Sequence, residues 1–203
     1  MSKAMNILYS VGDGLYINLT NRCSCSCTFC IRNEGDAIGS ADTLWLEHEP
    51  AAEEVISALK ETDLSPYSEV VFCGYGEPTE AFEVLKEVAT WLKTNTSLPV
   101  RINTNGQGSL ICERDIAPEL EGIVDALSIS LNTPDPEAYL ALTRSRYGKA
   151  AFDAVLDFVE RAKRFVPSIT LTTVSTTITA EQEAECARIC DSLGVTYRIR
   201  AFV

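Results

Sequence analysis

The chain has 203 residues, 46% of them hydrophobic, and it carries 29 acidic against 17 basic side chains, for a net charge of −12. This length allows one buried core, so we predict a single domain over residues 1–203. The acidic surface repels phosphate backbones, which disfavours nucleic-acid binding, and the apolar runs fall far short of the roughly 20 residues of a membrane span. Because no export signal is visible, we expect a cytoplasmic protein without membrane contact.

Strand and helix patterns alternate along the chain. A buried strand is predicted at residues 15–20, followed by a cysteine-rich loop. The long irregular segment 33–49 is expected to fold over that loop as a lid. Pro50 suits the first turn of a helix over 51–60. Later strands are predicted at 69–73, 100–104, 126–131, 169–176 and 196–203, and later helices at 80–93, 150–165 and 180–193.

Six strands alternating with helices require a parallel sheet with right-handed crossovers. An open doubly wound sheet and a partial barrel both satisfy that pattern. The unusual residues of the sequence follow the C-terminal ends of successive strands, and only in a barrel do those ends converge on one mouth. We therefore predict an α/β fold, a partial (β/α)6 TIM-like barrel that six strands leave incompletely closed.

Four of the eight cysteines lie in the stretch NRCSCSCTFCIR. Cys23, Cys27 and Cys30 can ligate three irons of a cubane [4Fe–4S] cluster and leave the fourth iron open to a ligand. In a protein without an export signal this pattern favours metal binding over disulfides. The cysteines outside the stretch are Cys73, Cys112, Cys186 and Cys190, and the last two, four residues apart on a predicted helix, are expected to be buried packing.

Two motifs together are similar to those of one enzyme superfamily. Cys23-x3-Cys27-x2-Cys30, with Phe29 before the third cysteine, resembles the cysteine motif of radical S-adenosylmethionine (radical SAM) enzymes. The turn Gly74-Tyr75-Gly76-Glu77-Pro78 resembles their second-strand signature, with Tyr75 in place of the first glycine of the usual Gly-Gly-Glu-Pro. The phrases FCGYGEPT and LTRSRYGKAAF more closely resemble the small TatD-associated radical SAM family.

The resemblance implies a radical SAM core with two cofactors, a [4Fe–4S] cluster and S-adenosyl-L-methionine (SAM). Reductive cleavage of SAM at the open iron would yield a 5′-deoxyadenosyl radical that abstracts hydrogen from an unidentified substrate. It further implies an electron donor such as flavodoxin or ferredoxin, and a partner protein is one class of substrate to consider.

The resemblance also assigns SAM contacts to the strand ends. Backbone carbonyls at Gly74 and Gly76 are expected to accept hydrogen bonds from the methionine ammonium, because no Cβ intervenes. Glu77 is expected to anchor this turn first and to contact SAM second. Ser130 and Asn132, two apart on one strand, are expected to share a face and bind the ribose hydroxyls or the methionine carboxylate.

Further candidates follow the remaining strands. Thr104 and Asn105 end one strand, although Asn-Gly is also an ordinary turn. Ser175 and Thr176 are expected to flank the adenine, with Val174 packing on its face. Arg200 shares a face with Arg198; if that face is inward, Arg200 is expected to bind the SAM carboxylate or an anionic substrate, and otherwise to guard an edge strand.

Several alternatives remain open. A zinc-binding structural or regulatory module would use Cys25 as a fourth thiolate beside Cys23, Cys27 and Cys30, but it leaves the Gly-Glu-Pro turn unexplained. Among enzymes, a glycyl-radical-enzyme activase is one alternative. An enzyme of the 7-carboxy-7-deazaguanine synthase type ranks lower, because Ile31-Arg32 follows the third cysteine. The basic run 143–149 is predicted to be a solvated loop.

Overall fold

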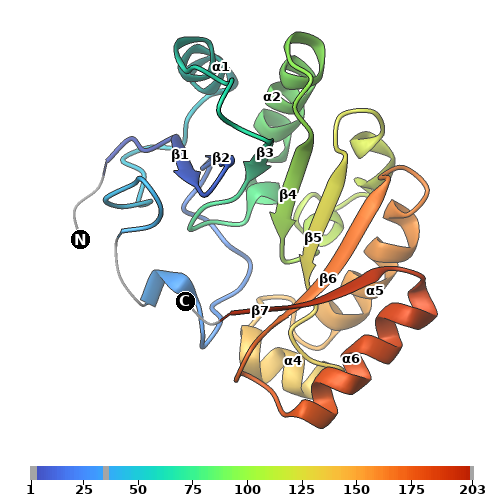
Figure 1. Cartoon of the computed structure of the whole chain (residues 1–203). Helices are drawn as coiled ribbons and strands as arrows, with labels where there is room; N and C mark the ends of the chain where they lie inside the picture. The colour runs from blue at the N-terminus through green and yellow to red at the C-terminus, as the bar shows by residue number, and fades with distance from the viewer. Residues whose placement is uncertain (1–3, 34–36, 202–203) are drawn as a thin grey trace.

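The computed structural model describes residues 4–33 and 37–201. Within these residues seven strands form one sheet in sequential order, and strands β2 to β7 all run parallel to one another (Figure 1). A doubly wound sheet would reverse its strand order, so the sequential order confirms the predicted partial barrel. The strands are β1 (Leu8–Val11), β2 (Gly14–Ile17), β3 (Glu69–Phe72), β4 (Val100–Thr104), β5 (Ala126–Ser130), β6 (Ser168–Val174) and β7 (Thr196–Arg200).

Strand β1 was not predicted. It pairs antiparallel with β2 through a turn at Gly12 and Asp13, where Gly12 has a φ of +60°. Two strand-like runs separated by Gly-Asp are a hairpin signal that the sequence does contain. The six predicted parallel strands are β2 to β7, and β1 adds an antiparallel edge to them.

The four long predicted helices are confirmed as α1 (Ala52–Glu61), α2 (Phe82–Asn95), α5 (Ala150–Ala162) and α6 (Ala180–Leu193). The prediction missed α4 (Pro136–Thr143), whose N-terminus is capped by the Asp135 carboxylate accepting hydrogen bonds from the backbone N–H groups of Glu137 and Ala138. No helix of the described residues is both long and apolar enough to cross a bilayer. The shorter elements are α3 (Gly108–Ile111), η1 (Ile31–Asn33), η2 (Pro78–Ala81) and η3 (Ala117–Leu120).

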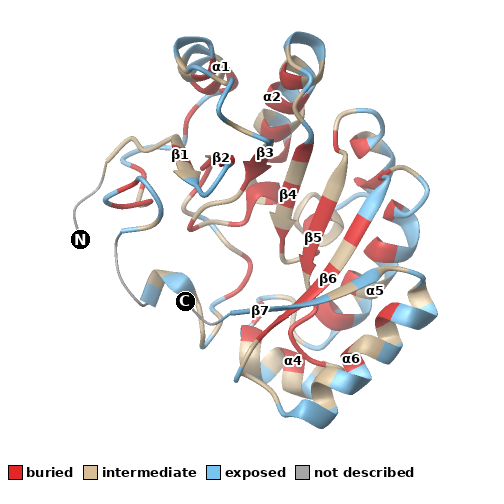
Figure 2. Ribbon diagram, viewed as in Figure 1, coloured by how far each residue is buried: buried red, intermediate tan, exposed pale blue. Residues whose placement is uncertain are grey.

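The outer face of the sheet forms the hydrophobic core. Phe72, Ile102 and Leu127 occupy paired positions on adjacent strands and are buried against the helices. Figure 2 shows the buried residues concentrated on the strands and on the helix faces that turn toward them. Cys186 and Cys190 belong to this core, which confirms their predicted packing role.

The inner face of the sheet is polar instead. Because side chains alternate along a strand, the same register places Asn103 beside Ser128, and Ser130 beside Thr172. Closed TIM barrels fill this space with branched apolar side chains. The polar inner face therefore suits a ligand better than a packed core.

Candidate functional site

The cysteine loop follows β2 and is held in place by two distant segments. On one side, the Asn21 side chain both donates to the carbonyl of Leu46 (2.8 Å) and accepts from its N–H (3.0 Å). On the other, the N–H groups of Ser26 and Thr28 donate to the carbonyls of Thr143 and Leu142, each at 2.9 Å. These four hydrogen bonds hold the loop in place through contacts within the protein.

The second contact corrects the prediction that the basic run 143–149 is only a solvated loop. Thr143, the last residue of α4, and Ser145 are buried, while Arg144, the left-handed C-cap of that helix, and Arg146 are exposed. The N–H of Arg146 also donates to the carbonyl of Ser24 at 2.9 Å. The run therefore supports the cysteine loop with its backbone, and its Arg146 side chain pairs with Glu80.

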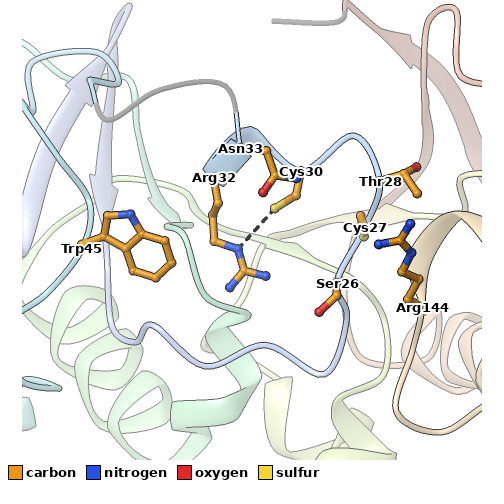
Figure 3. Close-up of a pocket in the computed structure, with 8 residues that line it drawn as sticks. All are labelled: Ser26, Cys27, Thr28, Cys30, Arg32, Asn33, Trp45 and Arg144. Carbon is orange, nitrogen blue, oxygen red and sulfur yellow. Dashed lines mark hydrogen bonds between the residues drawn. The ribbon is translucent and has the colours of Figure 1, made fainter. Parts of the chain in front are cut away.

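Cys27 and Cys30 border a cavity of about 360 Å³ (Figure 3). The Arg32 Nε donates to the Cys30 Sγ at 3.4 Å, and its guanidinium lies 5.9 Å from the centre of the Trp45 ring. Figure 3 shows the Arg144 side chain reaching toward Cys27 from the opposite wall. Trp45 belongs to the predicted lid, which here forms a wall of the cavity; residues 34–36 of that lid lie outside the described residues.

Cys25 points away from this cavity. It is 4% exposed, and the buried Gln107 Nε2 donates to its Sγ at 3.2 Å. Its neighbour Cys23 lowers the pKa of Cys25, but Cys27 and burial outweigh that effect and raise the pKa to about 12. The buried Cys25 thiol is therefore bound by Gln107 within the protein.

Gly74 and Gly76 pack against this chain itself. A Cβ on Gly76 would lie 2.2 Å from the carbonyl oxygen of Thr20, and one on Gly74 would lie 2.1 Å from the Oδ1 of Asn18. The Glu77 N–H also donates to the carbonyl of Arg22 at 2.8 Å. The glycines are thus required for the turn to meet the start of the cysteine loop, a reason that the sequence did not reveal.

The Glu77 carboxylate anchors this turn to β4. One of its oxygens accepts from the hydroxyls of Thr79 (2.8 Å) and Thr104 (2.7 Å), and the other from the N–H of Asn105 (2.7 Å). Burial raises the pKa of Glu77, and the hydrogen bonds from Thr104, Asn105 and Thr79 act in the opposite direction. A fully engaged carboxylate at 4% exposure fits the anchoring role.

The Thr104 and Asn105 side chains are likewise engaged within the protein. Thr104 Oγ1 accepts from the N–H of Gly106 at 3.0 Å while donating to Glu77. Asn105 Nδ2 donates to the Ser24 hydroxyl at 2.8 Å, and Asn105 Oδ1 accepts from the N–H of Gln107 at 2.9 Å. Contact of either side chain with SAM stays a prediction.

Gln107 is the centre of a hydrogen-bond network that holds the cysteine loop, and this role was not predicted from the sequence. Its Oε1 accepts from the hydroxyls of Ser24 (2.8 Å) and Ser145 (2.9 Å), and its Nε2 donates to the Tyr139 hydroxyl (2.9 Å). It thereby joins the cysteine loop, α4 and the segment after α4. No local pattern marks a glutamine for this role, because its partners lie 32 or more residues away.

Ser130 and Asn132 do not share a strand face. The strand β5 ends at Ser130, and Asn132 follows it with a left-handed φ of +65°. The N–H groups of Leu131 and Asn132 both donate to the carbonyl of Thr172. Two residues thus face one residue of the neighbouring strand, as in a β-bulge, and the alternation of side chains ends there. Among the described residues, the buried Oδ1 of Asn132 and Oγ1 of Thr133 have no hydrogen-bond partner, so a ligand can satisfy them.

Arg200 faces the mouth of the barrel. Its side chain reaches solvent, yet surrounding barrel atoms desolvate it and lower its pKa, while Cys73 and Cys27 act to raise it. Val174, its partner on β6, is buried, and Thr176 is exposed with a φ of +69°. Of the two orientations predicted for Arg200, the structure shows the inward one.

The chemistry of these donors fits a [4Fe–4S] cluster. All three motif cysteines are free thiols, and two of them border the cavity. Among residues 4–33 and 37–201, no three His, Cys, Asp or Glu side chains converge on a point where one metal ion could bind. A cubane binds thiolates at separate corners, so its ligands need not converge in that way.

A second cavity, of about 460 Å³, lies next to the turn. Its lining is largely apolar and includes Tyr9, Tyr16, Ile38, Leu44, Cys73 and Gly74. Burial raises the pKa of the Cys73 thiol, and the Asn103 and Tyr9 side chains and the nearby Arg200 and Arg101 act in the opposite direction. Cys73 therefore lies between this cavity and the arginines of the inner face.

Residues 17–192 match the Radical SAM superfamily. The chain is also 26% identical over 160 residues to "Molybdenum cofactor biosynthesis protein moc-5" of Caenorhabditis elegans, covering 79% of this chain and 24% of that protein.

Solved structures share the fold. SuiB of Streptococcus suis bound to the precursor peptide SuiA superposes with a TM-score of 0.70 at 18% identity, over 97% of this chain and 40% of that one. A radical SAM methyltransferase from Sphaerobacter thermophilus gives a TM-score of 0.60 at 17% identity, over 96% and 57% of the two chains. The chain thus spans between about a quarter and three fifths of the length of these relatives.

The family match decides between the enzyme and the zinc-binding module. The closer resemblance to the TatD-associated family stays a prediction. The match covers both the cysteine loop and the Gly-Glu-Pro turn, which are joined in space by the hydrogen bond from Glu77 to Arg22. The chain belongs to the Radical SAM superfamily, whose members are enzymes that use a [4Fe–4S] cluster and SAM.

Proposed function

We propose that this enzyme cleaves SAM reductively and abstracts a hydrogen atom from a substrate held inside the barrel. When bound, the cluster and SAM supply a 5′-deoxyadenosyl radical. The observation that carries the proposal is the cysteine loop, which is locked against the Gly-Glu-Pro turn at the mouth of a polar barrel.

Cys23, Cys27 and Cys30 would hold the cluster. Three thiolates leave one iron open for SAM, and the Gln107 network holds the loop in one conformation. Arg32 donates to the Cys30 sulfur, and this hydrogen bond helps to fix the position of that ligand at the wall of the cavity.

The SAM contacts are proposed at the surrounding strand ends. Carbonyls of the turn would orient the methionine ammonium, and the unpartnered Oδ1 of Asn132 would accept from a ribose hydroxyl. Val174 offers an apolar surface near the mouth for the adenine. The full set of proposed SAM-binding residues is Gly74, Gly76, Glu77, Thr104, Asn105, Ser130, Asn132, Val174, Thr176 and Arg200.

Enzymes of this superfamily need an electron donor, and we propose that a flavodoxin or ferredoxin docks beside the cluster. The chain has a net charge of −12, which repels an acidic donor over most of its surface. The exposed cations Arg144, Arg146 and Lys149 lie on the run that supports the cysteine loop. Arg146 pairs with Glu80 and Lys149 with Glu137, whereas Arg144 has no ion pair among the described residues, so Arg144 is the cation open to an acidic donor.

Anaerobic reconstitution tests the proposed function. The full chain, given iron, sulfide, SAM and dithionite, is expected to form 5′-deoxyadenosine, measured by liquid chromatography and mass spectrometry. Cys27→Ala is expected to abolish both the cluster absorbance and this product. Cys112→Ala is the matched control, because Cys112 lies outside the motif, and it is expected to retain both. Product formation by Cys27→Ala equal to that of the wild type would rule out the ligand assignment.

A further inference from the structure

The last strand directs two guanidinium groups into the barrel. The register pairs Thr172 with Arg198, and Val174 with Arg200. The alternate residue Tyr197 points the other way, where its hydroxyl lies 2.7 Å from that of Thr173 on the face that α6 covers. Arg198 and Arg200 therefore project from the inner face, two residues apart.

Within residues 4–33 and 37–201, neither arginine is neutralised by a carboxylate. Among the described residues, no carboxylate lies within ion-pair distance of Arg198 or Arg200. Arg101, on the same face, differs: both oxygens of Glu69 accept from it, at 2.9 and 2.5 Å. On the inner face, Arg198 and Arg200 thus remain without an ion pair among the described residues, whereas Arg101 does not.

The rest of the inner face offers neutral hydrogen-bonding groups near these cations. Ser130 and Thr172 occupy paired positions, and Thr172 is in turn paired with Arg198. A guanidinium group presents planar donors that match a carboxylate or a phosphate in two-point geometry. Both arginines are exposed, so they are open to a ligand that enters from the mouth of the barrel.

We propose that the substrate carries an anionic group, a carboxylate or a phosphate, which Arg198 and Arg200 bind inside the barrel. This inference rests on the proposed function and adds the chemical class of the substrate. Arg200 also lies near Cys27, so the carboxylate of SAM is a competing ligand for it. The test must separate those two ligands.

Anion titration of the reconstituted, SAM-loaded full chain provides that test. Inorganic phosphate and acetate are titrated separately by calorimetry, with chloride holding the ionic strength constant. Saturable binding of one or both is expected, and the tighter probe identifies the chemical group. Arg198→Gln with Arg200→Gln is expected to weaken binding at least tenfold. The corresponding double lysine variant keeps the charge but loses the two-point geometry, so its affinity is expected to lie between those of the glutamine variant and the wild type.

Arg188→Gln is the control: Arg188 pairs with Glu185 on the outside of α6, and the variant loses one of the two charges that the double variant loses. It is expected to leave anion affinity unchanged. The inference is overturned if the wild type binds neither anion, if the glutamine variant binds as well as the wild type, or if the control weakens binding equally. It is also overturned if SAM and the anions displace one another. Formation of 5′-deoxyadenosine by the same wild-type preparation is measured separately, so failure of the proposed function is recognised independently.

Discussion

At the scale of single residues, the Glu77 carboxylate is the most constrained side chain of the site. It accepts from two hydroxyls and from the backbone N–H groups of Thr79 and Asn105. Glu77→Gln places an amide donor where one oxygen now accepts, so we expect a loss of about 1.5–3 kcal/mol in the free energy of unfolding, measured with urea. Glu87→Gln, on the exposed side of α2, is expected to change it by less than about 0.5 kcal/mol. Equal stability of Glu77→Gln and the wild type would mean that the carboxylate does not anchor the turn.

The roles of single residues also show which contacts could be predicted from the sequence and which could not. The anchoring role of Glu77 was predicted from its place in the Gly-Glu-Pro turn, but its partners Thr104 and Asn105 at the end of β4 could not be. The need for glycine at position 76 was predicted from close approach to a ligand, and the structure adds a second reason: a Cβ there would meet the Thr20 carbonyl beyond the end of another strand. Contacts between distant segments leave no trace in local periodicity.

At the scale of elements, the cysteine loop depends on Gln107 for its link to α4. Gln107→Leu removes hydrogen bonds to Ser24, Tyr139 and Ser145 at once. We expect the far-ultraviolet circular dichroism to stay unchanged while a chelator removes cluster iron several-fold faster, because the loop is no longer fixed. Gln182→Leu, at the start of α6, is the control and should leave iron loss unchanged. Iron loss at the wild-type rate in Gln107→Leu would contradict the positioning role.

The long elements were predictable for a physical reason. Helices of three or more turns and buried parallel strands repeat their apolar residues often enough to reveal their period. Strand β1 and helix α4 are only four and eight residues long, so turn and capping signals had to identify them instead. The position of Asn132 was mispredicted because a bulge after β5 breaks the alternation of side chains.

At the scale of the whole molecule, charge distribution governs encounter with an electron donor. We expect the rate of cluster reduction by an acidic flavodoxin to fall steeply with ionic strength, measured by stopped-flow absorbance. Arg144→Glu combined with Lys149→Glu should lower that rate at low salt about tenfold or more and flatten its salt dependence. Arg188→Glu, on the far side of α6, should affect it much less. An equal effect of both changes would locate the docking surface elsewhere.

The central claim is that three cysteines hold a cubane cluster and leave one iron to SAM. Electron paramagnetic resonance of the reconstituted, reduced full chain, with and without SAM, tests this most directly. We expect about four irons and four sulfides per chain and a reduced-cluster signal whose g-values shift when SAM is added. A zinc-containing protein without this signal, or a signal that SAM leaves unchanged, would contradict the account.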